Sequence, residues 1–141
     1  MHQKYRGSFL FLCLILFLAS LFFYFSKEQR TAFPVHEEGR LISVGDLKDL
    51  SAKKESFVLL DVRLQEEYDA GHIENAILMP LNTLSTRFNE LPKDKPIIVY
   101  CRTGRRSAQA TSFLRSKGFA NAIDLSGGYS EWMSRKTAEP H

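Results

Sequence analysis

The chain has 141 residues, of which 44% are hydrophobic and 25% are charged. That balance excludes a disordered chain, and the length suits one ordinary domain with an appendage rather than two enzyme domains. The formal net charge is +3, but all 16 acidic residues lie at Glu28 or later, so setting Lys4 and Arg6 aside leaves 17 basic residues and a net charge of +1. Nucleic acid is therefore not an expected partner.

The first distinct feature is an apolar segment at 7–26 that contains no charged residue. Twenty residues in a helix measure about 30 Å, the thickness of the hydrocarbon core of a bilayer. Lys4 and Arg6 precede the segment, and Lys27 and Arg30 follow it. We therefore expect a basic N-terminus at 1–6, a transmembrane helix at 7–26 that anchors a single-pass protein in the lipid bilayer, and a polar linker at 27–39.

A cleaved secretory signal is the alternative for this segment, and such a signal needs small residues at its cleavage site. Ala19, Ser20 and Leu21 match that requirement poorly, and bulky Tyr24 lies two residues before Ser26. An uncleaved anchor is therefore the favoured interpretation. Two basic residues flank each side of the segment, so their number does not decide its orientation in the membrane. Only the short basic N-terminus favours an orientation with the domain outside the cytoplasm.

The remaining domain at 40–135, with a tail at 136–141, alternates short apolar runs with helical signals. The runs are typical of buried strands in a parallel sheet, and they lie at 41–42, 57–60, 77–79, 97–100 and 122–125. Between them are a possible capping box at 43–46, an apolar helical face that ends at Pro92, and a helix at 107–117 closed by Gly118. This order predicts an α/β domain with a central parallel sheet, helices on both faces, and ligand chemistry at the carboxyl ends of the strands.

The loop after the apolar run at 97–100 combines one cysteine, three arginines and one glycine. It consists of Cys101, Arg102, Thr103, Gly104, Arg105 and Arg106. A loop this short between a strand and a helix must curl, which turns backbone N–H groups toward one point beside the positive end of the helix dipole. A thiolate is stabilised at such a point, and the thiolate is the nucleophilic form of cysteine.

A cysteine without a partner is more commonly a small apolar residue of the core. The three arginines and Gly104, which permits a tight backbone turn, favour catalysis for Cys101 instead. No histidine is adjacent in sequence, so the backbone rather than a general base is expected to activate the sulfur. Cys13, in the apolar segment, is the other cysteine of the chain, which excludes a disulfide framework or a cysteine-rich zinc site, and we expect no metal and no other cofactor.

With these motifs in view, the domain resembles the rhodanese family of sulfurtransferases over about 40–133. The matching features are the opening at 42–47, the Asp61-Val62-Arg63 stretch, the segment at 67–76, the cysteine loop, and Gly127 and Gly128 before Trp132. The resemblance implies that Cys101 takes a sulfane sulfur from thiosulfate or a similar small donor, such as a persulfide. A thiol acceptor, free or on a protein, then removes the sulfur from the Cys101 persulfide.

Phosphatase-like relatives of this family place five residues between the cysteine and an arginine. Here Ser107 occupies that arginine position, so the shorter loop favours sulfur transfer over phosphatase or arsenate reductase chemistry.

Position and charge suggest further roles within the site. We expect the backbone N–H groups of 102–106 to hold the sulfur, and Arg102 and Arg105 to bind an anionic donor. Arg106 is expected to reach Asp61 and fix the shape of the loop, and Arg63 to tie neighbouring loops together.

Several other polar residues have simpler interpretations. His72 follows Gly71 in a turn and is expected to be structural rather than a general base. Glu66 and Glu67 are interpreted as a solvated helix face, and Trp132 is expected to pack on the sheet.

Two other functions remain as alternatives to the enzyme. One is a persulfide carrier or redox relay that serves a protein partner and has little activity on free thiosulfate. The other is a binding module without catalysis, which the intact cysteine loop disfavours.

Overall fold

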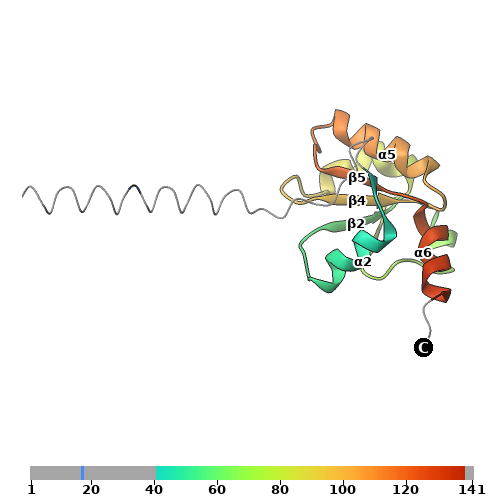
Figure 1. Cartoon of the computed structure of the whole chain (residues 1–141). Coiled ribbons are helices and arrows are strands. Elements are labelled where there is room, and N and C mark those ends of the chain that lie inside the picture. Colours follow the sequence, from blue (N-terminus) through green and yellow to red (C-terminus); the bar gives the residue numbers. More distant parts are fainter. Residues whose placement is uncertain (1–16, 18–40, 139–141) are drawn as a thin grey trace, which may run out of the picture. The chain divides into compact units, whose positions relative to one another are not determined.

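The computed structural model describes Phe17 and residues 41–138. Residues 41–138 contain a five-stranded sheet whose paired strands are all parallel (Figure 1). The strands are β1 (Leu41–Ile42), β2 (Val58–Asp61), β3 (Ile77–Leu78), β4 (Ile97–Tyr100) and β5 (Ala122–Leu125). Their order across the sheet is β1-β5-β4-β2-β3, which puts β4 at the centre.

Helices cover both faces of the sheet, as the alternating sequence pattern predicts. Figure 1 shows α5 over one face and α2 beneath the other, with the sheet between them. The helices are α2 (Val44–Ala52), α3 (Gln65–Asp69), α4 (Leu81–Arg87), α5 (Arg105–Ser116) and α6 (Gly128–Thr137), with a short 3-10 helix, η1 (Phe88–Glu90), after α4. Helix α4 packs with α5, and α2 packs with α6. The α/β fold with a central parallel sheet is therefore confirmed.

Local signals in the sequence explain where most elements begin and end. Ser43 and Asp46 form the expected capping box, in which each side chain accepts from the other residue's backbone N–H, at 3.1 and 3.2 Å. All four residues of β4 are buried, because a central parallel strand has helices over both of its faces. A continuous core of β2, β4, α4 and α5 side chains supports the end of β4 from one side.

Some element boundaries differ from the expectation; β2, for example, covers Val58–Asp61 rather than 57–60. Helix α5 begins at Arg105 rather than near Ser107, because Gly104 already serves as its N-cap and its carbonyl accepts from Ala108 N–H at 3.0 Å. The apolar face that includes Leu84 is divided between α4 and η1.

Trp132 is half-buried, and the ammonium nitrogen of Lys48 in α2 lies 5.6 Å from its ring centroid.

The expected transmembrane segment at 7–26 lies outside the described residues except for Phe17. Within the part of the chain that the structure describes, no helix has both the length and the apolar character needed to cross a membrane.

Candidate active site

The expected site residues meet at the carboxyl edge of the sheet, where three neighbouring strands end. Cys101 directly follows the central strand β4, Asp61 is the last residue of β2, and Gly127 and Gly128 follow β5 after Ser126. Parallel strands bring these chain segments together although they are distant in sequence.

The sulfur of Cys101 is enclosed by hydrogen-bond donors. Gly104 N–H donates to Sγ at 3.2 Å, and the Ser107 hydroxyl oxygen lies 3.5 Å from it. Burial by itself raises the pKa of the Cys101 thiol, since only 1% of the residue is exposed. The Ser107 hydroxyl and the backbone N–H groups of Ser107, Gly104 and Thr103 outweigh that effect and bring the pKa below its ordinary value. Hydrogen-bond donors therefore account for the lowered pKa of the Cys101 thiol.

The loop can point its amides inward because helix α6 satisfies its carbonyls from outside. Tyr129 N–H donates to the carbonyl of Cys101 at 2.8 Å, and Ser130 N–H donates to the carbonyl of Arg102 at 3.0 Å. These donors belong to the first turn of α6, where N–H groups have no partner within the helix. A side chain at Gly128 would collide with the carbonyl oxygen of Cys101 and come within 3.0 Å of that of Arg102. Glycine at 128 therefore permits this contact.

Gly104 gives the loop its curl. Its φ is +107°, a conformation that other residues rarely adopt, and nothing lies within 4 Å of the place where a Cβ would sit. The requirement for glycine at 104 is therefore one of backbone conformation and not of space.

The three loop arginines have different surroundings. Arg102 and Arg105 are exposed at the loop. Arg106 does not reach Asp61, as the sequence suggested, but pairs with Glu67 of α3 through two hydrogen bonds of 2.6 and 2.8 Å. The prediction was wrong because Arg106 lies in the first turn of α5, while Asp61 is already bound by Arg63.

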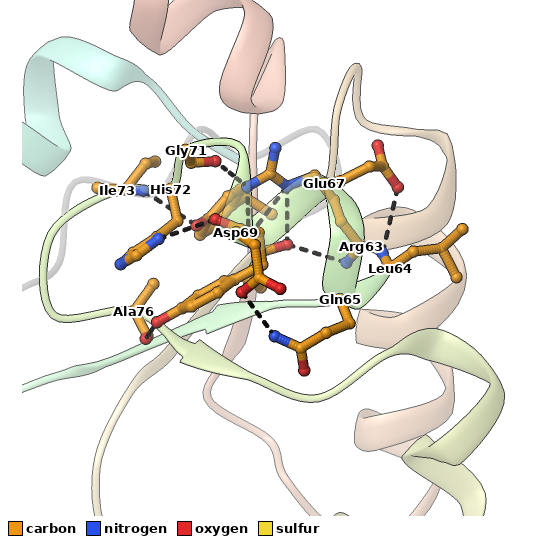
Figure 2. Close-up of polar contacts among 12 residues, drawn as sticks. Arg63, Leu64, Gln65, Glu67, Asp69, Gly71, His72, Ile73 and Ala76 are labelled. Carbon is orange, nitrogen blue, oxygen red and sulfur yellow. Dashed lines mark hydrogen bonds and ion pairs between the residues drawn. The ribbon is translucent and has the colours of Figure 1, made fainter.

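Glu67 is consequently not a solvated helix residue, and that interpretation is also corrected. The pairing with Arg106, together with the Leu64 backbone N–H at 3.1 Å, lowers the pKa of Glu67 to about 2 against the opposing effect of burial. Figure 2 shows the Glu67 carboxylate in contact with the backbone of Leu64. Glu67 joins α3 to the cysteine loop, and only its match to the family segment at 67–76 offered a sequence signal for such a role.

Asp61 and Arg63 form a buried ion pair beneath the edge of the sheet. Arg63 Nε and Nη2 donate to the Asp61 carboxylate at 2.7 to 3.0 Å, and the two side chains are 3% and 0% exposed. Arg63 also donates to the Gly71 carbonyl at 2.8 Å (Figure 2). Its Cζ lies 4.2 Å from the ring centroid of Tyr129. The pair thus ties β2, the turn after α3 and α6 together, as expected for Arg63.

His72 lies in the expected turn and has local partners. Its ring stacks on Tyr68 with the centroids 3.7 Å apart, and Nδ1 is 3.0 Å from the Tyr68 carbonyl oxygen. This placement agrees with a structural role.

Among the described residues, no group of three His, Cys, Asp or Glu side chains could hold a metal ion.

Ser107 is the main site residue that the sequence did not suggest. It is fully buried, and its hydroxyl contacts both the sulfur and, at 3.0 Å, the carbonyl of Gly104. In the sequence, Ser107 occupies the position where phosphatase-like loops have arginine, and it served only to define the length of the loop. That position did not predict the contact of its hydroxyl with the Cys101 sulfur.

Comparison with known proteins identifies the fold family. The family model described as rhodanese-like domain matches residues 43–135. The chain belongs to the rhodanese-like family. This finding agrees with the resemblance seen in the motifs of the sequence, and the matched region contains the cysteine loop and its contacts with α3 and α6.

Members of the rhodanese-like family that are similar to this chain include named sulfurtransferases. A sulfurtransferase of Allochromatium vinosum is 36% identical over 81 residues, covering 57% of this chain and 76% of that protein. The solved structure of the human single domain sulfurtransferase TSTD1 matches with 30% identity and a TM-score of 0.61, over 68% of this chain and 96% of the human chain. The probable adenylyltransferase/sulfurtransferase MoeZ of Mycobacterium tuberculosis is 34% identical over 97 residues, but this chain spans only 25% of its length.

Proposed function

We propose that this rhodanese-like protein is a sulfurtransferase in which Cys101 carries the transferred sulfur as a persulfide. The observation that supports this most strongly is the enclosure of Cys101 Sγ by the Gly104 N–H and the Ser107 hydroxyl, with the backbone of Thr103 and Ser107 close by. Such donors stabilise negative charge both on the free thiolate and on the outer sulfur of a persulfide.

The reaction has two steps with a covalent intermediate. The Cys101 thiolate attacks the sulfane sulfur of a donor such as thiosulfate; a new S–S bond forms, the donor's S–S bond breaks, and its electron pair leaves on sulfite. An acceptor thiolate then attacks the outer sulfur, and Cys101 leaves again as a thiolate. Both steps are displacements at sulfur, and ping-pong kinetics follow.

Arg102 and Arg105 are proposed to attract the anionic donor. Both are exposed at the loop, whereas Arg106 is held by Glu67. Asp61 and Arg63 support the site without contacting the reacting atoms, because they are almost completely buried against each other.

Replacing Cys101 with Ser tests the proposal. We expect sulfur transfer from thiosulfate to cyanide or a thiol to be lost while the circular dichroism spectrum stays that of the folded protein. Cys13→Ser is the matched control because it removes the other cysteine of the chain and is expected to leave transfer unchanged. Undiminished transfer by folded Cys101→Ser protein would exclude the proposal.

A persulfide carrier for a protein partner is the second candidate. The similarity to MoeZ favours the carrier. In MoeZ the matched stretch is a minor part of a protein that is named for two activities. Both candidates use the same Cys101 loop and differ in kinetics. Rapid turnover of free thiosulfate supports the enzyme, whereas Cys101 persulfide formation without turnover supports the carrier.

We also propose that the segment at 7–26 anchors the rhodanese-like domain in a membrane, with the domain outside the cytoplasm. The support is the uncharged sequence of that segment and its basic flanks. Protease digestion of sealed vesicles tests the orientation: protection of the domain from added protease in inside-out vesicles, and its digestion in right-side-out vesicles, is the expected result.

A further inference from the structure

The Ser107 hydroxyl differs from the backbone donors around Cys101 because its hydrogen can change direction. The Gly104 N–H is fixed by the backbone of the α5 N-cap and donates to Sγ. The Ser107 side chain is fully buried and has two acceptors within reach, Cys101 Sγ at 3.5 Å and the Gly104 carbonyl oxygen at 3.0 Å. A hydroxyl has one hydrogen to donate, so these two acceptors compete for it.

The charge on Sγ decides which acceptor receives that hydrogen. A hydrogen bond to an ionised acceptor is about twice as strong as one to a neutral acceptor. Burial raises the pKa of the Cys101 thiol, and among the groups that lower it the Ser107 hydroxyl has the largest effect. The Gly104 carbonyl keeps a partner when the hydroxyl turns away, because Ala108 N–H donates to the same oxygen at 3.0 Å. The hydroxyl can therefore turn between the sulfur and Gly104 without leaving that carbonyl unpaired.

Sulfur transfer changes the charge on Sγ twice. The free thiolate carries its negative charge on Sγ. In the persulfide, Sγ is bonded to both Cβ and the outer sulfur, and the negative charge lies on the outer sulfur. When an acceptor thiolate attacks the outer sulfur, the S–S bond to Sγ breaks and its electron pair returns to Sγ. During this release step, negative charge therefore builds up beside the Ser107 hydroxyl.

We propose that Ser107 is a catalytic residue of the release step. Its hydroxyl donates to the Gly104 carbonyl while Cys101 carries the sulfur, and it turns to donate to Sγ as the Cys101 thiolate leaves. The hydrogen stays on Ser107 Oγ throughout, so the step forms one S–S bond and breaks another without proton transfer. The inference rests on the proposed function of Cys101 as the sulfur carrier.

The two steps should respond differently to loss of the hydroxyl. Before loading, the hydroxyl stabilises the attacking thiolate, and a thiolate of higher pKa is a better nucleophile, by about threefold for each pKa unit. In release, the hydroxyl stabilises the leaving thiolate far more than the neutral Sγ of the persulfide. Ser107→Ala should therefore slow release by about tenfold, and it should not slow loading once Cys101 is fully ionised.

Single-turnover kinetics of the full-length protein separate the two steps. Loading is followed as sulfite released from thiosulfate, and release as sulfur transfer from the isolated persulfide protein to 2-mercaptoethanol. Both are measured at a pH at which the ultraviolet absorbance of the Cys101 thiolate is complete, with Cys101→Ser protein as the blank. During turnover with both substrates, the intact mass should show a larger persulfide fraction in Ser107→Ala protein than in the wild type.

Ser107→Thr and Ser107→Val form a matched pair, because the two side chains have similar shapes and differ in the hydroxyl. Threonine should keep most of the wild-type release rate, whereas valine should release sulfur as slowly as alanine. Thr111→Val is the control for structural disturbance. It removes another buried hydroxyl of α5, which donates to the Ser107 carbonyl at 3.0 Å, and it should leave both steps unchanged.

Wild-type release by Ser107→Ala protein, or equal slowing of loading and release, would overturn the inference. Release by Ser107→Thr protein that is as slow as that of Ser107→Val would overturn it as well. These outcomes leave the proposed function intact, since each is measured on a Cys101 persulfide that has formed. Failure of the wild-type protein to form any persulfide would instead exclude the proposed function itself.

Discussion

At the scale of single residues, the chemistry of Cys101 is a balance between burial and hydrogen bonding. Burial opposes ionisation of the thiol, yet the Ser107 hydroxyl and nearby amides bring the pKa of the Cys101 thiol below its ordinary value. The sulfur of Cys101 is thus buried, whereas Arg102 and Arg105 at the loop are exposed.

Arg102→Ala should weaken the use of thiosulfate mainly through KM. Loss of one exposed positive charge near a dianion is worth about 1 kcal/mol, or about a fivefold rise in KM, and the effect should shrink at high salt. Steady-state kinetics at two ionic strengths measure it. A purely kcat effect that salt does not change would contradict the proposed contact with the donor.

The Glu67–Arg106 pair should stabilise the loop as well as the fold. Glu67→Gln removes one charge of a pair whose side chains are 27% and 31% exposed, so we expect a loss of about 1 kcal/mol in the free energy of unfolding by urea, and slower sulfur transfer. Glu90→Gln breaks the more exposed pair with Arg87 and is the matched control, with little change expected in either quantity. Equal effects of the two substitutions would contradict a special role for Glu67.

At the scale of the elements, the site depends on the first turn of α6 as much as on the cysteine loop itself. The N–H groups of Tyr129 and Ser130 bind the loop carbonyls from outside, and the Asp61–Arg63 pair holds the same region from below through Tyr129. Helix α6 is thus a part of the site that contributes no reacting side chain.

Gly128→Ala should separate α6 from the loop. The new methyl group would overlap the Cys101 carbonyl, and overpacking of this kind costs about 1 to 3 kcal/mol. We expect lower stability in urea unfolding and a raised pKa of the Cys101 thiol. Gly45→Ala is the control, because a Cβ there meets its nearest neighbour at 3.6 Å; it should be neutral or stabilising, as alanine is within helices. A Gly128→Ala protein with wild-type stability and thiol pKa would refute this dependence.

At the scale of the whole molecule, two carboxyl groups should give stability opposite dependences on pH. The pKa of Glu67 is lowered on folding, so its contribution is present above pH 4.5 and is lost as the pH falls toward about 2. The pKa of Asp124 is raised on folding from an ordinary 3.8, so its contribution is complete below pH 3.8 and is lost as the pH rises toward its folded value.

Asp124→Asn should therefore gain stability relative to the wild type as the pH rises above about 4. The gain should grow by up to about 1.4 kcal/mol per pH unit until Asp124 ionises in the folded wild type. Urea unfolding at a series of pH values measures it. A stability difference that does not change with pH would show that Asp124 has the same pKa in the folded and unfolded states.

Much of this molecule follows from local patterns in the sequence. Apolar runs located all five strands, and the loop residues 101–106 indicated both the cysteine and the curl that surrounds it. The contacts that the sequence did not predict join residues that are distant along the chain. Pairing of Arg106 with Glu67 and contact of α6 with the loop both depend on the strand order β1-β5-β4-β2-β3, which no spacing in the sequence specifies.

The central claim is that Cys101 accepts a sulfane sulfur, and the most direct test is the mass of the intact protein after incubation with thiosulfate. We predict the addition of one sulfur atom, located on the peptide that contains Cys101 and removed by a thiol. An unchanged mass in the folded protein, or a sulfur atom found only on Cys13, would contradict the account.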